Sequence, residues 1–375
     1  MRVLVAGGGT GGHFYPGLAI LEGLRDGEAE AEFAYVGTRS GIEARALPSY
    51  PWIRFYPIHA QGVSRGGPLR NVPTILCTLF GMLETLWIFV RFRPEIVIGV
   101  GGYASFAPVF LGAVLGKLLG IRTLIHEQNV VAGLANRWLS RLVDLVLVSF
   151  PETKRSFPLA RRLVVAGNPI REEFLHVRRS DATYRRFGLD PARRTILVFG
   201  GSKGAREITD QIVTGKDVVR ENDGLQILLI TGSEATTDSI RWEFAAAGVA
   251  NVAVETYVER MGEAFAIADL VVCRAGATSL AEITACGKAS VLIPWREAAD
   301  DHQLRNARWM QEEEACAVID GEGIVARDLV RIIAGLIRDE LALERLADNA
   351  GRLGKRGAKA RILGEIRSMM RGAGA

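Results

Sequence analysis

The chain has 375 residues, of which 49% are hydrophobic and 23% are charged. This length and composition fit a globular protein with two cores and exclude a disulfide-rich secreted scaffold. The net charge of +4 is uneven: residues 1–166 carry 17 basic against 11 acidic side chains, residues 351–375 carry 7 against 1, and the middle is acidic. If any part of the chain binds an anionic surface, we expect it to be the basic first part.

The cysteines and the N-terminus narrow the class further. The four cysteines are scattered without a C-x-x-C pair, which favours reduced thiols and argues against a zinc site. No basic stretch precedes a short apolar core at the start of the chain, so we expect no signal peptide.

Apolar runs of Val, Ile and Leu alternate with helix-like segments along the whole chain, as is typical of strands buried on both faces of a parallel sheet. The runs lie at 2–6, 32–37, 95–100, 122–127 and 144–149, and then at 194–200, 225–232, 251–256, 269–276 and 290–294. The pattern predicts an α/β fold with two doubly wound halves. We expect an N-terminal domain at 1–166, a C-terminal domain at 167–350, and a basic helix at 351–375 that either packs back on the first domain or lies free.

The segment 72–90 is about long enough to span a bilayer. Its apolar residues favour insertion by about as much as Glu84, Pro73, Gly81 and the threonines oppose it. Because a strand-like run follows within a few residues, we favour a surface helix whose apolar face either packs on the core or enters the headgroup region of a membrane.

Gly7–Gly12, with the sequence GGGTGG, follows the first apolar run and fits G-x-G-x-x-G. A dinucleotide fold also needs an acid at the end of the second strand, and residues 35–39 contain none. Arg39 could serve the 2′-phosphate of NADP, so that alternative stays open. His13 would place a titratable group at the mouth of the loop, either as a helix-capping residue or as a base.

Other polar groups follow strand ends, where doubly wound sheets bind ligands. Gly200–Ala205, with the sequence GGSKGA, is a phosphate cradle by geometry and helix dipole but is not a Walker A loop. Glu282 would lie a turn or more into a helix and could accept hydrogen bonds from a ribose diol. The remaining polar groups are the glycine turn 99–103, the cluster 126–129 and the group 300–303.

These motifs in this order resemble the MurG family, the N-acetylglucosaminyl transferases of bacterial peptidoglycan synthesis. The matching stretches are TGGHFYPGLAI, GVGGYASFAPV, HEQNVVAGLANRWL, GNPIR, GGSKGA, RAGATSLAEI and DDHQLRNA. The resemblance implies a GT-B fold, in which two Rossmann-like domains face each other across a cleft. It also implies inverting transfer of GlcNAc from UDP-GlcNAc to O4 of MurNAc in undecaprenyl-pyrophosphoryl-MurNAc-pentapeptide (lipid I), giving lipid II. No Asp-x-Asp motif occurs, so we expect no metal and no other cofactor.

The resemblance also implies roles for particular residues. His13 is the candidate catalytic base, and Glu127 is its competitor. Tyr257 and the backbone of Val258 match the uracil-binding positions, and Glu282 matches the residue that holds the ribose. The substrate-binding residues implied are Thr10, Gly11, Gly12, Asn129, Arg171, Ser202, Val258, Ala277, Thr278, Ser279, Leu280, Ala281, Glu282 and Gln303.

The expected setting is the cytoplasmic face of the plasma (inner) membrane, with the protein bound peripherally to an anionic surface. Cell-wall synthesis proteins are possible partners, and no nucleic acid is expected. Alternatives on the same fold are a diacylglycerol glycosyltransferase and a UDP-GlcNAc 2-epimerase. Alternatives from other functional classes are an NADP-dependent oxidoreductase and a non-catalytic sugar-nucleotide binding module.

Overall fold

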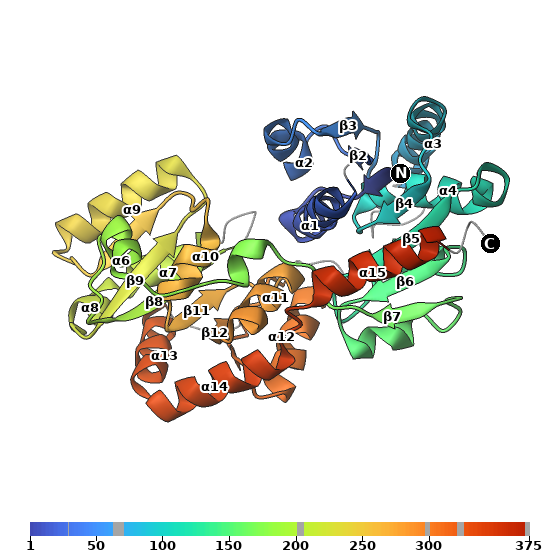
Figure 1. The fold of residues 1–375 in the computed structure, drawn as a ribbon. Helices are drawn as coiled ribbons and strands as arrows, with labels where there is room; N and C mark the ends of the chain where they lie inside the picture. The colour runs from blue at the N-terminus through green and yellow to red at the C-terminus, as the bar shows by residue number, and fades with distance from the viewer. Residues whose placement is uncertain (29, 63–70, 201–205, 297–300, 321–325, 372–375) are drawn as a thin grey trace. The chain divides into compact units, whose positions relative to one another are not determined.

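The computed structural model describes residues 1–28, 30–62, 71–200, 206–296, 301–320 and 326–371 (Figure 1). The chain forms two compact units: unit 1 is Met1–Ile170 together with Gly357–Ala375, and unit 2 is Arg171–Arg356. The boundaries therefore lie a few residues beyond the predicted 166 and 350. Helix α14 (Glu340–Leu353) packs on α11 (Ala277–Cys286) and β12 (Ala289–Leu292), and Arg356 Nη2 donates to the Leu175 carbonyl oxygen at 2.5 Å.

In unit 1 the described residues form a seven-stranded parallel sheet with the order β3-β2-β1-β4-β5-β6-β7. The central strands are buried because helices cover both faces, which explains their uninterrupted apolar sequences, whereas the edge strands β3 and β7 are only partly buried. The strands are β1 (Arg2–Ala6), β2 (Glu32–Gly37), β3 (Ile53–Pro57), β4 (Ile96–Gly99), β5 (Arg122–Glu127), β6 (Leu145–Val148) and β7 (Leu163–Val165). The helices are α1 (Gly11–Gly27), α2 (Ile42–Ala46), α3 (Val72–Phe92), α4 (Phe106–Leu119), α5 (Leu134–Leu139) and α15 (Ala358–Arg371).

The basic C-terminal helix packs on unit 1. Helix α15, drawn in red in Figure 1, lies against α1, and Ile362 and Ile366 are fully buried in the core between α1 and the sheet. Burial of such side chains contributes about 1.5–3 kcal/mol each, so the helix is an integral part of the unit. The opposite face of the sheet is covered by α3, α4 and α5.

In unit 2 the described residues form a six-stranded parallel sheet with the order β10-β9-β8-β11-β12-β13. The strands are β8 (Arg194–Phe199), β9 (Leu225–Ile230), β10 (Val252–Glu255), β11 (Leu270–Cys273), β12 (Ala289–Leu292) and β13 (Ala317–Val318). The helices are α6 (Asp181–Phe187), α7 (Arg206–Thr214), α8 (Lys216–Arg220), α9 (Glu234–Ala246), α10 (Met261–Ile267), α11 (Ala277–Cys286), α12 (His302–Glu312), α13 (Ala326–Arg338) and α14 (Glu340–Leu353). The prediction of two doubly wound α/β halves is confirmed.

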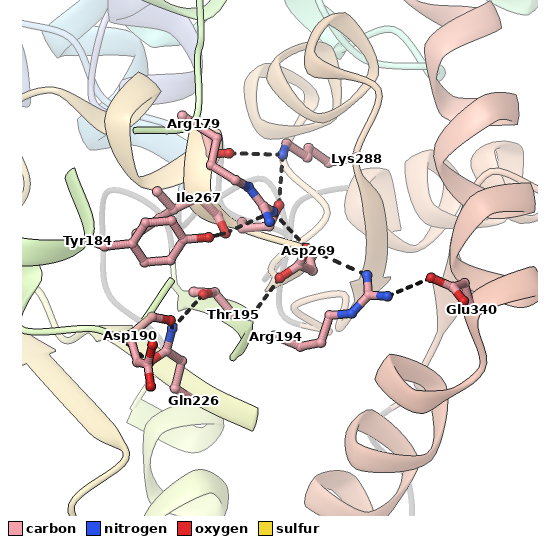
Figure 2. A network of polar contacts seen from close by, with 12 residues as sticks. Arg179, Tyr184, Asp190, Arg194, Thr195, Gln226, Ile267, Asp269, Lys288 and Glu340 are labelled. Atoms are coloured by element: carbon pink, nitrogen blue, oxygen red, sulfur yellow. Dashed lines mark hydrogen bonds and ion pairs between the residues drawn. The ribbon is translucent and has the colours of Figure 1, made fainter. Parts of the chain in front are cut away.

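A polar network ties the amino-terminal edge of the second sheet together (Figure 2). Asp269, just before β11, accepts hydrogen bonds from the Thr195 backbone N–H and from Arg179 Nη2, each at 2.7 Å. Arg194 Nη2 extends the network to Glu340 on α14 at 2.7 Å. Because parallel strands present ligands at their carboxyl edge, these charges serve the fold and leave the other edge for chemistry.

Candidate active site

Both sheets reverse their strand order at one point, and the residues predicted for the site lie beside those two points. In unit 1 the reversal is between β1 and β4, and in unit 2 it is between β8 and β11. Loops at the carboxyl ends of such strand pairs diverge to opposite faces of the sheet and leave a crevice for a ligand.

In unit 1, α1 begins at the glycine loop that follows β1. Thr10 is the N-cap residue, with an extended backbone, and its carbonyl oxygen accepts from the His13 and Phe14 N–H groups. Gly11 and Gly12 form the first helical turn, which contains no acidic side chain. This helix N-terminus is electropositive and suits an anionic group.

Glu43 on α2 contacts the start of the same loop. It was not predicted from the sequence. Its fully buried carboxylate accepts hydrogen bonds from the Gly9 N–H at 3.0 Å and from the Thr38 N–H at 2.7 Å. The carboxylate lies so close to Gly8 that a Cβ there would be 2.2 Å from Glu43 Oε1. A phosphate would meet a like charge at this position, which disfavours the NADP alternative. Glu43 lies a few residues beyond the end of β2, outside residues 35–39, where a dinucleotide fold would have its acid.

His13, in the first turn of α1, lies against the turns that follow β4 and β5. Its Nδ1 lies 3.2 Å from Gln128 Oε1. Gly101 has a φ of +89°, and a Cβ there would be 2.7 Å from His13 Nδ1. Glycine at this position therefore permits both the turn and the close approach to the imidazole.

Glu127, the competing base, is 2% exposed and holds the turn after β5. One carboxylate oxygen accepts from the Asn129 N–H and side-chain amide at 3.1 and 3.2 Å. The other accepts from the Gly133 N–H at 3.1 Å and the Asn136 side chain at 2.8 Å. Four donors in this geometry stabilise the ionised carboxylate and fix the loop that carries Asn129.

Arg171 is the first residue of unit 2, and its side chain pairs with Glu282 on α11. Arg171 Nη2 lies 3.4 Å from Glu282 Oε1, and Nη1 lies 2.9 Å from Glu173 Oε1. The guanidinium stacks over the Phe174 ring at 4.9 Å. Burial raises the pKa of Glu282 from 4.5 to about 7, opposed by Arg171 and assisted by Glu173. Glu282 is therefore a carboxyl group that changes charge near neutral pH.

The remaining predicted residues of unit 2 lie around the same edge. Val258 is buried after β10, whereas the neighbouring Tyr257 is exposed. Gln303, at the start of α12, accepts from the Trp295 N–H at 3.0 Å through its side-chain oxygen. Ser202 lies outside the described residues. The first turns of α11 carry Ala277, Thr278, Ser279, Leu280, Ala281 and Glu282.

The described part of the chain contains no group of three or more His, Cys, Asp or Glu side chains able to hold a metal ion. Unit 1 presents the N-terminus of α1, and unit 2 presents the N-terminus of α11 together with the Arg171 guanidinium.

Comparison with known proteins identifies the class. Residues 3–148 match the glycosyltransferase family 28 N-terminal domain, and residues 195–362 match its C-terminal domain. Together with the two Rossmann-like units, these matches define a two-domain glycosyltransferase.

Curated relatives identify the family within that class. A UDP-N-acetylglucosamine–N-acetylmuramyl-(pentapeptide) pyrophosphoryl-undecaprenol N-acetylglucosamine transferase of Desulforudis audaxviator is 37% identical, with 98% of each chain covered. The protein of the same name from Lactiplantibacillus plantarum is 36% identical, covering 99% of this chain and all of the other. A crystal structure of Acinetobacter baumannii MurG is 26% identical with a TM-score of 0.74, covering 98% and 99% of the two chains. The chain belongs to this family, the MurG N-acetylglucosaminyl transferases, which confirms the resemblance seen in the sequence.

A more distant likeness shows only the shared fold. A putative UDP-N-acetylglucosamine 2-epimerase from Listeria monocytogenes has a TM-score of 0.68 at 13% identity, covering 99% and 97% of the two chains.

Proposed function

We propose that the chain transfers GlcNAc from UDP-GlcNAc to O4 of MurNAc in undecaprenyl-pyrophosphoryl-MurNAc-pentapeptide, with inversion at the anomeric carbon. The observation that carries the proposal is the division of chemistry between the units. Unit 1 presents an imidazole beside an electropositive helix N-terminus, and unit 2 presents a buried acid beside an arginine and another helix N-terminus. The near full-length match to enzymes named for this reaction supports it.

The donor belongs to unit 2 in this scheme. Glu282 accepts the ribose hydroxyls, the Val258 backbone contacts uracil, and Arg171 with the turn leading into α11 faces the diphosphate. The same scheme assigns Ser202 to the diphosphate, and Gln303, together with Asn129 of unit 1, to the donor sugar. An arginine and a helix N-terminus can stabilise departing UDP electrostatically.

The acceptor belongs to unit 1, where Thr10, Gly11 and Gly12 face its pyrophosphate and His13 takes the proton. The MurNAc O4–H bond breaks, and its proton passes to the His13 imidazole. O4 forms a bond to C1 of GlcNAc as the bond from C1 to the β-phosphate oxygen breaks, and UDP leaves with the electron pair. Attack opposite to the leaving group inverts C1.

His13 is the better base of the two candidates. Glu127 accepts hydrogen bonds from four donors, so both of its carboxylate oxygens are already engaged within the loop. Those bonds also shape the Asn129 turn, so Glu127 acts as a structural anchor in this proposal.

The reaction is tested by mixing the protein with UDP-GlcNAc and a lipid I analogue. Transfer of GlcNAc to the analogue supports the proposal. Release of ManNAc without acceptor would point to the epimerase alternative, and transfer only to diacylglycerol would point to the other lipid glycosyltransferase.

We also propose that unit 1 binds peripherally to an anionic membrane surface through α3, α4 and α5. Of the helices in the described part of the chain, α3 is long and apolar enough to cross a bilayer. However, Ile88, Phe89 and Phe92 pack in the core, which favours a helix lying on the domain surface. The outward side chains include Ile75, Leu76, Leu79, Phe80, Leu83, Trp87 and Val90 on α3, Leu118 and Leu119 on α4, and Trp138 on α5.

The charges around this apolar surface fit the same proposal. The Glu84 carboxylate on α3 accepts from the His59 N–H at 2.6 Å and lies 2.8 Å from the His59 ring. Both carboxylate oxygens are therefore paired within the unit. Lys117 lies in the last turn of α4, and the Arg141 guanidinium lies over the Trp138 ring at 5.6 Å. Basic side chains beside an apolar surface suit anionic headgroups.

Substituting Leu79→Glu and Leu83→Glu together should reduce binding to vesicles containing anionic lipid by at least about tenfold, because two apolar contacts become two charges. Flotation with vesicles measures the effect. Ile332→Glu with Leu341→Glu is the matched control, since both side chains are exposed and belong to unit 2. Equal flotation of the two double variants would show that α3 is not the membrane-binding surface.

A further inference from the structure

Three polar side chains of unit 1 form a chain of hydrogen bonds that ends at His13. His126 Nε2 lies 2.9 Å from the Gly167 carbonyl oxygen. Gln128 Nε2 lies 3.1 Å from His126 Nδ1, and Gln128 Oε1 lies 3.2 Å from His13 Nδ1. His126 and Gln128 are fully or almost fully buried, so their side chains have little freedom to exchange partners with water.

The surroundings of Gln128 fix which end of its amide faces His13. Gln128 Nε2 lies 2.9 Å from the Val100 carbonyl oxygen and 3.1 Å from the His126 carbonyl oxygen. Carbonyl oxygens only accept hydrogen bonds, so the atom that faces them must be the amide nitrogen. The amide oxygen is left to face His13, and an oxygen in that place requires a proton on His13 Nδ1.

His126 supports the same orientation. Its Nε2 must donate to the Gly167 carbonyl oxygen, which leaves Nδ1 as an acceptor for the Gln128 amide. Burial lowers the pKa of His126 to about 4, which outweighs the opposing effect of the bond to Gly167. His126 is therefore neutral near pH 7, and its Nδ1 keeps the lone pair that Gln128 needs.

We propose that Gln128 is a positioning residue for the transfer reaction, because it holds the proton of neutral His13 on Nδ1 and so keeps the basic lone pair on Nε2. This inference rests on the proposed role of His13 as the base. Which imidazole nitrogen carries the proton is set by the partner of the other nitrogen. After His13 takes the acceptor proton at Nε2, the Gln128 oxygen still accepts from Nδ1–H and stabilises the imidazolium.

The inference is tested first on the unaltered protein by ¹⁵N NMR of its five histidines. The His13 signal is assigned by its loss in His13→Gln. We expect the chemical shifts of neutral His13 to show a protonated Nδ1 and an unprotonated Nε2. A proton on Nε2 in the unaltered protein would overturn the inference without any variant, and it would do so whether or not GlcNAc transfer is observed.

Gln128→Met then removes the amide at similar side-chain volume. We expect the His13 tautomer to shift towards Nε2–H and kcat for GlcNAc transfer to fall about 10- to 100-fold, which is less than the 10²- to 10⁴-fold contribution of a general base because the base itself remains. KM for UDP-GlcNAc should change little, because Gln128 is not among the proposed donor contacts, and all of these except Asn129 lie in unit 2. A shifted tautomer with unchanged kcat, or a lowered kcat with an unchanged tautomer, would contradict the positioning role.

Gln226→Met is the matched control for the loss of a buried amide. Gln226 in unit 2 is also almost fully buried and donates to the Asp190 carbonyl oxygen at 2.7 Å (Figure 2). Both variants lose hydrogen bonds to buried carbonyl groups, so both should lower the melting temperature. The His13 tautomer should shift only in Gln128→Met. An equal shift in both variants would mean that general destabilisation, and not Gln128, sets the tautomer.

Discussion

Replacing His13 by glutamine should lower kcat for GlcNAc transfer by about 10²- to 10⁴-fold, which is the usual contribution of a positioned general base. Glutamine can occupy the same place beside Gln128 but cannot accept the acceptor proton near neutral pH. The affinity for UDP-GlcNAc should be nearly unchanged, because His13 is not among the proposed donor contacts, and all of these except Asn129 lie in unit 2. Steady-state kinetics with a lipid I analogue, together with calorimetric donor binding, separates the two effects.

The same measurement on Glu127, the alternative base, provides the comparison for this prediction. Glu127→Gln places amide hydrogens against groups that already donate, such as Asn136 Nδ2 and the Gly133 N–H. We therefore expect a lower melting temperature and a smaller loss of kcat per folded molecule than in His13→Gln. If His13→Gln retained normal kcat while Glu127→Gln folded normally and lost all turnover, the assignment of the base would be reversed.

Substituting Glu282→Gln should weaken UDP-GlcNAc binding about 10- to 100-fold at pH 8. Hydrogen bonds to a charged group contribute about 1.5–3 kcal/mol each, and the neutral amide keeps one acceptor in place of the carboxylate. Titration calorimetry measures the effect. Glu340→Gln is the matched control, because Glu340 pairs with Arg194 at the opposite edge of the same sheet (Figure 2). Equal affinities of the two variants would remove Glu282 from the donor site.

The pH dependence of donor binding tests the same residue independently. Burial raises the pKa of Glu282 to about 7, so the carboxyl group is largely protonated at pH 6 and ionised at pH 8. The ribose hydroxyls bind the ionised form better, so affinity for UDP-GlcNAc should rise through this interval and then level off. Glu282→Gln should flatten the rise. A rise of equal size in the variant would assign the titration to another group.

The same pKa shift has a consequence for stability. A carboxyl group whose pKa is raised on folding binds its proton more tightly in the folded protein, so the free energy of unfolding falls as pH rises from about 4.5 to about 7. Glu282→Gln lacks this titration and should gain stability relative to the unaltered protein above pH 7.

The fold could be predicted from the sequence where strands are buried on both faces, because uninterrupted apolar runs leave little ambiguity. The edge strand β3 was not predicted, since Ile53–Pro57 mixes Arg54 with aromatic residues and is only partly buried. The strand β13 has two residues and leaves no pattern to detect. The tail predicted as one helix is divided between the end of α14 at Leu353 and α15.

The candidate site could be predicted as a set of loops and not as a set of contacts. Gly7–Gly12 and His13 follow one strand and are recognisable locally. The ion pair of Arg171 and Glu282 joins residues 111 positions apart, which no local pattern reveals. For a similar reason Glu43 was missed, and Gln128 was recognised only as part of the polar cluster 126–129, without a role. Their importance lies in which backbone groups they contact, and the sequence alone does not state those contacts.

A crystal structure of the protein with UDP-GlcNAc bound tests the central claim most directly. We predict that the nucleotide lies on unit 2, with its ribose on Glu282 and its uracil beside Val258, and that no nucleotide occupies the Gly7–Gly12 loop of unit 1. Uridine diphosphate seated on the Gly7–Gly12 loop, with Glu282 distant from it, would contradict the assignment of donor and acceptor to the two units.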